Sequence, residues 1–463
     1  MRRLPQTVAA VFWLWCGPAA GDAGDGERPA IQFNRWQENW SVLADPAVPR
    51  EPLDGLKYLS LSDSDPLTYA SFGANLRERF ESNDAAGFGT SGSKADQYVI
   101  SRLELHSDLH VGPHLQMFTQ LQSDHAIDKS THSPVDQDRL DLEQAFIAVV
   151  TAVDGGTVKL RVGRQQFAFD LQRFVSVRDG PNVRQSYDAA WADYESGAWR
   201  LISFYSHPVQ ARDTRPFDDT SNGHLTYGGL RLERQLTSSS SLAAYVSRFT
   251  QDSVRFTSVT GNEQRQIADL HYAGTLSAVD WDIEAMGQSG RVGSQDVRAW
   301  ALGSLAGYTF TAERWRPRVG VQFDVASGDK HPDDGQLNTF NPLFPNGYYL
   351  TLSGYTGYVN LVHLKPSVTL YPASGLKVLL AAGAQWRQTT ADAVYTQPNI
   401  PIAHTAGLAG RYTGTYGQFR ADCALTAHVA VALEVVHFAV SRALRTVGAH
   451  DSDYLGAEVK LAW

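Results

Sequence analysis

The feature that most constrains this chain is a two-residue alternation of apolar and polar side chains, which recurs from about Leu67 onward. Segments of this kind, each of roughly ten residues, are typical of strands with one face in lipid and the other in water. After residue 23 no stretch approaches the roughly 18 to 20 unbroken apolar residues of a membrane-spanning helix. If this chain spans a membrane, it must do so as a closed β-barrel, in which every backbone polar group is paired.

Eighteen candidate strands can be counted along the chain. In the first, Phe72 and Leu76 lie on one face and Arg77 lies on the other. The segments span residues 70–79, 99–111, 115–122, 140–150, 158–163, 187–195, 199–205, 226–234, 242–249, 266–272, 281–285, 297–308, 316–325, 358–370, 376–386, 412–425, 429–439 and 455–463.

The links between these segments alternate in length, which a soluble β-sandwich has no reason to do over so many strands. Tight links such as Ser196-Gly197 alternate with long polar links such as 123–138 and 327–357. Eight short turns and nine long loops are what an 18-strand barrel needs when both termini are periplasmic. The sequence therefore predicts an all-β fold: a transmembrane antiparallel β-barrel of about 18 strands, with short periplasmic turns and long extracellular loops.

The N-terminus predicts export. Arg2 and Arg3 precede an apolar run from Val8 to Cys16, and small residues follow it, which is typical of a secretory signal peptide. We expect a signal peptide at 1–23, an N-terminal periplasmic extension at 24–66 and the barrel at 67–463. After cleavage only Cys423 remains, so the mature chain cannot form an internal disulfide.

The last segment indicates where the exported chain goes. Leu461 and Trp463 continue an apolar face that alternates with a polar face containing Glu458 and Lys460. A strand of this kind with an aromatic end resembles the signal that the barrel-assembly machinery reads, although an ordinary amphipathic edge strand is the alternative. The expected location is the outer membrane of a Gram-negative-type envelope, where lipid and lipopolysaccharide are partners.

The charge of the chain is acidic overall but its basic residues are unusual. The formal net charge is -9, and the 40 basic residues comprise 32 Arg and 8 Lys. Arg binds carboxylate and phosphate groups bidentately. The overall acidity argues against a nucleic-acid partner.

Charged side chains of the strands should point into the lumen, because a charge facing lipid costs a few kcal/mol near the bilayer midplane. This rule predicts basic lumen residues Arg77, Arg79, Arg102, Lys159, Arg161, Arg231, Arg316, Arg318, Lys377 and Arg420. The acidic ones are Glu104, Asp108, Asp141, Glu143, Glu233, Asp269, Asp324, Glu434 and Glu458. Two interpretations stay open: cross-strand pairs that serve as structural ladders, or a collective field that concentrates anions in a pore.

The least ordinary part of the chain is the segment from Arg161 to Asp188, which has five Arg within 24 residues around Gly180-Pro181-Asn182. In an extracellular loop each of these charges would be screened within about 10 Å. We therefore expect the segment to fold partly into the lumen and form a selectivity zone. Its candidate site residues are Arg161, Arg164, Arg173, Arg178, Asn182, Arg184 and Asp188. The alternative is that Arg173, Arg178 and Arg184 pair with Asp170, Asp179, Asp188 and wall carboxylates and simply hold the loop in place.

Here the sequence resembles a known family. The Gly163-Arg164-Gln165 strand end and the stretch Arg178-Asp179-Gly180-Pro181-Asn182-Val183-Arg184 are similar to those of the alginate-export family of outer-membrane porins. Stretches 36–46, 326–329 and 339–345 are similar too, so the resemblance covers nearly all of the mature chain. It implies an 18-strand barrel with an Arg-lined, anion-selective pore that exports a carboxylated polysaccharide such as alginate. This chain departs from the family pattern in its scattered lumen acids and its N-terminal extension.

No catalytic motif stands out, and no cofactor is expected. The sequence has no H-E-x-x-H, G-x-S-x-G or P-loop pattern. Asp329, Asp333 and Asp334 are weak candidates for Ca²⁺, against the alternative of a solvated acidic loop. We expect a channel rather than an enzyme. The alternatives are a general or nutrient-uptake porin with mild anion preference, or a non-transporting barrel that acts as an envelope anchor or surface enzyme.

Overall fold

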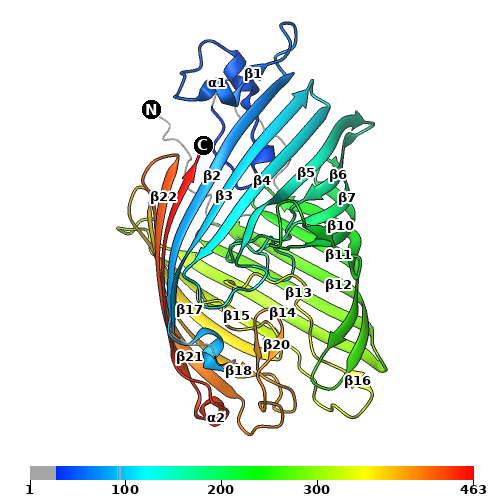
Figure 1. Ribbon diagram of the computed structural model, residues 1–463, viewed down its shortest axis with the longest axis vertical. Coiled ribbons are helices and arrows are strands. Elements are labelled where there is room, and N and C mark those ends of the chain that lie inside the picture. Colours follow the sequence, from blue (N-terminus) through cyan, green and yellow to red (C-terminus); the bar gives the residue numbers. More distant parts are fainter. Residues whose placement is uncertain (1–27, 91, 93–94) are drawn as a thin grey trace.

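The structure is a computed structural model that describes residues 28–90, 92 and 95–463. Its main feature is a closed antiparallel barrel of eighteen strands, which confirms the predicted fold class (Figure 1). Each of the eighteen predicted segments overlaps one strand of the wall. The predicted signal peptide at 1–23 lies outside the described residues.

The wall comprises β2 (Tyr69–Asn83), β3 (Asp96–Val111), β4 (Leu115–Ile127), β5 (Asp138–Val153), β6 (Gly156–Gln165), β7 (Tyr187–Ser196), β8 (Trp199–Gln210), β10 (Leu225–Thr237), β11 (Ser240–Arg255), β12 (Thr260–Leu276), β13 (Val279–Val292), β14 (Gln295–Thr309), β15 (Arg318–Ala326), β17 (Leu361–Ala373), β18 (Leu376–Arg387), β21 (Tyr412–Ala424), β22 (Val429–Val440) and β23 (Ser452–Ala462). The short strands are β1 (Leu59–Ser60), β9 (Thr220–Ser221), β16 (Gln336–Leu337), β19 (Tyr395–Thr396) and β20 (Ile400–Pro401). The helices are η1 (Arg35–Gln37), η2 (Trp40–Ala44), α1 (Asp54–Lys57), η3 (Ala86–Gly89) and α2 (Arg442–Arg445). No helix in the described part of the chain is long and apolar enough to cross a membrane.

The pairing of the first wall strand with the last closes the barrel. β2 pairs with β23 in antiparallel register, from Asn75 opposite Ala462 to Asn83 opposite Tyr454. This ladder pairs the two strands that would otherwise form exposed edges of the sheet. The closed sheet thus satisfies its backbone hydrogen bonds internally, as a lipid environment requires.

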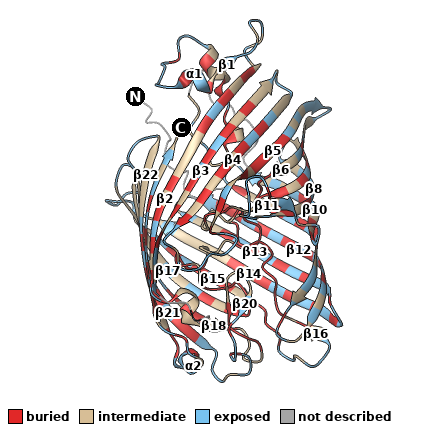
Figure 2. Cartoon of the chain, in the orientation of Figure 1, coloured by how far each residue is buried: buried red, intermediate tan, exposed pale blue. Residues whose placement is uncertain are grey.

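The two faces of the wall differ as the alternation predicts. In β3, Leu103 and Leu105 are 37% and 48% exposed on the outer face, while Arg102 and Glu104 are each 2% exposed on the inner face. Figure 2 shows the same alternation of buried and exposed bands along many strands. The outer face is therefore apolar, and charged strand residues are concentrated on the inside.

The links confirm most of the predicted pattern. We call the end that holds Trp463 the turn end and the opposite end the loop end. All eight links at the turn end lie at or next to the predicted tight positions, such as 197–198 between β7 and β8. Two of the nine links at the loop end, 256–259 and 293–294, are short where the sequence predicts long loops. The reason is that β11 to β14 continue beyond the apolar band with polar residues on both faces, so the alternation that marks a strand fades before the strand ends.

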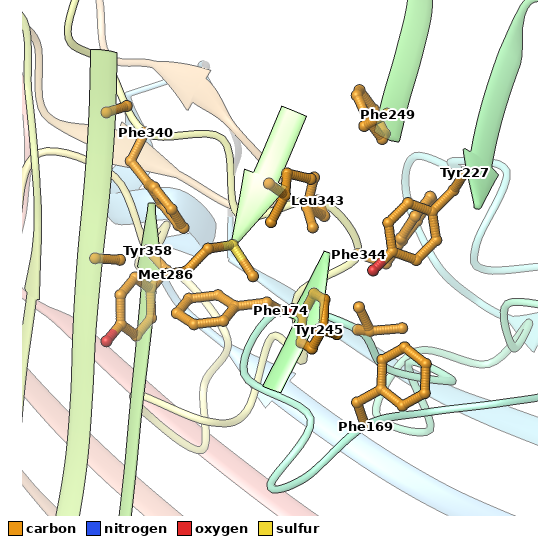
Figure 3. Close-up of a cluster of buried hydrophobic side chains, with 14 of the residues drawn as sticks. Phe169, Phe174, Tyr227, Tyr245, Phe249, Met286, Phe340, Leu343, Phe344 and Tyr358 are labelled. Atoms are coloured by element: carbon orange, nitrogen blue, oxygen red, sulfur yellow. The ribbon is translucent and has the colours of Figure 1, made fainter. Parts of the chain in front are cut away.

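Part of the lumen is filled by a hydrophobic cluster. Loops 166–186 and 327–360 turn inward and pack against inward-facing residues of β7, β8 and β10 to β14. Phe174 of the first loop contacts Phe340 and Tyr358 of the second, with ring centroids 5.3 Å apart in each pair (Figure 3). The two loops and one side of the wall therefore form a solid core inside the barrel.

The N-terminal segment 28–58 is attached to the turn end. Arg35 forms an ion pair of 2.6 Å with Glu38 and donates hydrogen bonds to Asn75 Oδ1 and the backbone oxygen of Trp463. Trp36 packs edge-on against the inward-facing ring of Phe146. The segment therefore binds the strands that close the barrel and also reaches into the lumen.

A buried lysine, Lys57, lies near the end of this segment. The ammonium of Lys57 lies 4.5 Å from the ring centroid of Trp463 and 5.1 Å from that of Trp40. Lys57 is 1% exposed, and its Nζ has no hydrogen-bond partner among the described residues. Burial, together with the nearby charge of Arg35, lowers the pKa of Lys57 to about 8. Trp463, expected on the lipid face, thus has its ring half-buried against Lys57.

We predict that Lys57 makes the stability of the barrel depend on pH. Between pH 8 and the ordinary lysine pKa near 10.5, the folded state releases a proton that the unfolded state keeps, so stability rises with pH across this window. The gain in melting temperature between pH 7 and pH 10 should therefore be larger for the wild type than for Lys57→Met, as measured by circular dichroism. Equal gains would contradict this and indicate that the two indole rings keep Lys57 charged.

Candidate functional site

The loop 166–186, which links β6 to β7, is held inside the barrel by hydrogen bonds from one amide side chain. Asn182 Nδ2 donates to the backbone oxygens of Ser101, His125 and Asp136 at 3.0 to 3.1 Å. These acceptors lie on β3, on β4 and in the link between β4 and β5. The Gly180-Pro181-Asn182 turn is thereby fixed against the wall.

Four cations surround one carboxylate in this turn. The Asp179 carboxylate lies 2.7 Å from Arg102, 2.8 Å from Arg184, 3.7 Å from Lys460 and 4.0 Å from Arg77. We call these five residues the Asp179 cluster. Burial alone would raise the pKa of Asp179, but the surrounding cations hold it well below its usual range.

The wall arginines of the Asp179 cluster also bind the backbone of the turn. Arg77 donates to the backbone oxygens of residues 179, 180 and 181. Arg102 donates to those of residues 179, 181 and 182. Much of the hydrogen-bonding capacity of these guanidinium groups is therefore used to fix the loop. The Asp179 side chain itself remains 32% exposed.

Acidic residues of the wall balance part of the positive charge. Arg184 pairs with Glu104 at 2.7 Å, and Arg77 lies 3.7 Å from Glu458. Arg79 pairs with three carboxylates, those of Glu81, Glu434 and Glu458. This side of the lumen is therefore a mixed network of charges rather than a ring of unpaired arginines.

Two arginines of the loop have different surroundings. Arg173 is 1% exposed, pairs with Asp282 at 2.5 Å and Glu284 at 3.0 Å, and donates to the Tyr349 hydroxyl. Arg178 has no carboxylate partner among the described residues. It donates to Gln185 Oε1 at 3.3 Å and lies 5.8 Å from the ring of Phe344. Arg173 therefore attaches the loop to β13, whereas the charge of Arg178 is left for other interactions.

The remaining predicted lumen cations mostly pair within the wall. Lys159 pairs with Glu195 at 2.9 Å, and Arg318 pairs with Asp280 at 2.5 Å. Arg420 pairs with Asp422 at 2.6 Å and also with Glu434. Arg161 lies 4.4 Å from the ring of Trp36 and bonds to Gln165. These contacts fit the structural-ladder interpretation, residue by residue.

Three predicted site residues lie elsewhere than expected. Arg164 and Asp188 pair with each other at 3.0 Å. Both point away from the lumen, because their positions alternate with those of inward-facing Gln165 and Tyr187. Arg164 also binds the backbone oxygen of Asp219 in the link between β8 and β10, so the pair supports that link. The structure places Arg316 in the turn before β15, where it is exposed.

The weak calcium candidates are not brought together. Asp333 and Asp334 are exposed. Asp329 is buried, and its carboxylate accepts a hydrogen bond of 3.1 Å from the Ser258 hydroxyl. In the described part of the chain, the carboxylate groups close enough to share one ion are two other sets. The idea of a calcium site at Asp329, Asp333 and Asp334 is therefore not supported.

Sequence reasoning missed two parts of the site. Lys460 alternates with outward-facing Val459 and Leu461, so its register would have placed it in the lumen. Phe33 of the N-terminal segment lies 4.5 Å below the guanidinium of Arg184, and no pattern in the sequence indicates this contact. The N-terminal segment and loop 166–186 therefore meet inside the barrel.

The family model for alginate export matches residues 68–458, nearly the whole barrel. The chain belongs to the alginate export family. This confirms the family that the sequence resembles. No curated protein sequence matches the chain.

Solved structures similar to the barrel show the same fold at low sequence identity. OpdO of Pseudomonas aeruginosa is 12% identical with a TM-score of 0.55, covering 85% of this chain and 97% of that one. OpdQ of the same organism is 11% identical with a TM-score of 0.58, covering 85% and 98%. OccAB3 of Acinetobacter baumannii is 11% identical with a TM-score of 0.57, covering 85% and 99%. Fold and family together indicate an outer-membrane channel of porin type.

We predict that Arg173 and Arg178 have separable roles. Arg173→Ala leaves Asp282 and Glu284 buried with less compensation and should lower barrel stability by about 3 kcal/mol, because breaking a buried pair exposes its desolvation cost. Arg178→Ala removes no ion pair and should change stability by less than about 1 kcal/mol. Thermal unfolding in detergent measures both.

The two variants also serve as controls for each other in conductance. Arg178→Ala should reduce the preference for anions in planar bilayers, whereas a folded Arg173→Ala barrel should keep it. If Arg178→Ala changes neither stability nor selectivity, Arg178 neither contributes to a selectivity zone nor holds the loop in place.

Proposed function

We propose that the protein exports an anionic polysaccharide of the polyuronate type, which passes along the Arg-rich side of the lumen formed by β2, β3, β21 and β23. Family membership supports an exporter, and the register of the wall supports a polar passage. The proposal covers both the substrate class and the path.

The observation that carries this proposal is the Asp179 cluster. A carboxylate already lies among three guanidinium groups and an ammonium in this lumen, at distances typical of direct ion pairs. Guanidinium groups fit a uronate carboxylate as well as they fit that of Asp179. Because Lys460 is 44% and Asp179 32% exposed, an incoming carboxylate meets Lys460 first and reaches the buried guanidinium groups as Asp179 gives way.

The acidic residues around the cluster fit the need for release. A channel must bind its substrate strongly enough to admit it and weakly enough to let it move on. Glu104, Glu434 and Glu458 compete with a passing anion for Arg184, Arg420 and Arg79. Acids among lumen arginines, a departure from the family pattern, would therefore favour movement over retention.

A second candidate function is uptake of small anionic solutes. The hydrophobic cluster of loops 166–186 and 327–360 occupies part of the lumen, which favours solutes smaller than a polymer chain. Both functions use the same cations, so the length of a blocking sugar distinguishes them.

Planar-bilayer recordings of the full-length barrel test the proposal. We predict a reversal potential that favours anions, and block by oligomannuronate or oligoguluronate that strengthens with chain length. Block by monomeric uronate without any dependence on chain length would support uptake instead. Cation-favouring conductance, or block by neutral oligosaccharides alone, would rule out a polyanion path.

A variant of Asp179 tests whether this carboxylate competes with the substrate for the cations of the cluster. Asp179→Asn removes the internal competitor while the backbone oxygens that bind Arg77 and Arg102 remain. Block by oligouronate should then tighten by about tenfold, which corresponds to about 1.4 kcal/mol. Asp280→Asn is the matched control, because it removes a carboxylate paired with Arg318 at 2.5 Å on β13, outside the proposed path, and its block should equal that of the wild type. Equal block of Asp179→Asn and the wild type would show that Asp179 does not compete.

A further inference from the structure

Three carboxylates converge on the opposite side of the lumen from the Asp179 cluster. Asp170 comes from loop 166–186, Asp269 from β12 and Glu284 from β13, and one oxygen of each lies within 4.8 Å of the others. Asp269 and Glu284 are 5% and 2% exposed. Like charges at such short range repel one another strongly in a buried site.

One of these carboxylates is left without a partner. Neither Oδ1 nor Oδ2 of Asp269 has a hydrogen-bond partner among the described residues. The residue opposite Asp269 on β11 is Tyr245, whose buried hydroxyl also has none. A buried charged group without a partner costs several kcal/mol unless it takes up a proton or binds a cation.

The cations nearby are already used by other acids. Arg231 binds Asp170 at 2.6 Å and 2.8 Å with two nitrogens. His271 bridges Asp170 at 2.8 Å and Asp282 at 2.9 Å.

Arg173 binds Asp282 and Glu284. The four acids Asp170, Asp269, Asp282 and Glu284 thus face two guanidinium groups and one imidazole. Arg231 also pairs with Glu233 at 2.6 Å, and no cation of the described residues pairs with Asp269, so with all carboxyl groups ionised this site lacks positive charge.

We propose that Asp170, Asp269 and Glu284 bind a hard divalent cation, Ca²⁺. Ca²⁺ is held by carboxylate and other oxygen ligands at 2.3–2.6 Å, which spaces opposite ligand atoms by up to about 5 Å. The separation of at most 4.8 Å fits this geometry. The ion neutralises Asp269, which the protein side chains leave uncompensated.

A cavity of about 410 Å³ adjoins this site. Asp170 lines it, together with His271 and Asp282. Its other walls include Gly197 and Ser238 from two links at the turn end. The cavity supplies an entry path for the ion and water molecules to complete its coordination.

The ion would attach loop 166–186 to the wall at a second point. Phe169 packs beside Tyr245 in the hydrophobic cluster (Figure 3). Asp170 follows Phe169 in the sequence and precedes Arg173, which binds β13. A ligand set drawn from the loop, β12 and β13 cross-links three segments that are far apart in the sequence. Ca²⁺ therefore stabilises the inward position of the loop.

Calcium titration of the full-length barrel in detergent, after removal of metals with EDTA, tests the proposal. We expect the wild type to bind Ca²⁺ saturably and to gain melting temperature upon binding. Asp269→Asn and Glu284→Gln should each weaken binding at this site by at least about tenfold and lose that gain. In EDTA, Asp269→Asn should be at least as stable as the wild type, because it removes an uncompensated charge.

Two control variants make the result specific. Glu233→Gln removes a carboxylate from the same cavity that is not one of the three ligands, so it should bind Ca²⁺ like the wild type. Asp138→Asn removes a member of the other acidic group, Asp138, Asp141 and Asp219. It should abolish any Ca²⁺ binding at that group and leave binding at Asp170, Asp269 and Glu284 unchanged.

Two results would overturn the proposal. One is Ca²⁺ binding by Asp269→Asn and Glu284→Gln that equals the wild type. The other is a wild type that binds no Ca²⁺. If Asp269→Asn is then also more stable than the wild type, a proton shared by the carboxylates takes the place of the ion.

Discussion

The backbone ladder between β2 and β23 is the interaction on which the rest of this structure depends. It converts an open sheet into a closed one and leaves no edge of the wall unpaired in lipid. Closure also creates an inside, to which alternate residues of every strand must point. Charges that lipid would penalise are thereby collected in the lumen, where water and other charges can stabilise them.

Charges that are buried in the lumen must be paired. Arginines of the wall bind groups of loop 166–186, and an arginine of the loop binds groups of the wall. Wall residues Arg77 and Arg102 bind backbone oxygens and a carboxylate of the loop. Loop residue Arg173 binds carboxylates of the wall. This reciprocity explains why arginines and acids are mixed along the lumen, since each partner keeps the other from the cost of an isolated buried charge.

The sequence predicts the strands and their inner faces because both follow from a period of two, as Arg77, Arg79 and Arg102 illustrate. The prediction for Arg164 was wrong because it was grouped with the lumen residues of the segment from Arg161 to Asp188. Alternation from inward-facing Arg161 puts Arg164 on the outer face. The sequence could not predict which residues pair with each other across the lumen. Arg173 and Asp282 are 109 residues apart, and their contact depends on how an irregular loop folds inside the barrel. The excess charge of Asp269 is likewise visible only when the neighbouring pairs are known.

The two halves of loop 166–186 are held by different forces, and this decides which half can respond to a substrate. Phe167, Phe169 and Phe174 are at most 5% exposed, so moving the first half would expose apolar surface to water. The second half is held by ion pairs and hydrogen bonds, and Asp179 in it is 32% exposed. Its partner Lys460 is 44% exposed, whereas Arg77, Arg102 and Arg184 are at most 9% exposed. The first half therefore keeps the loop in the lumen, while the pair of Asp179 and Lys460 is the part of the second half that water reaches.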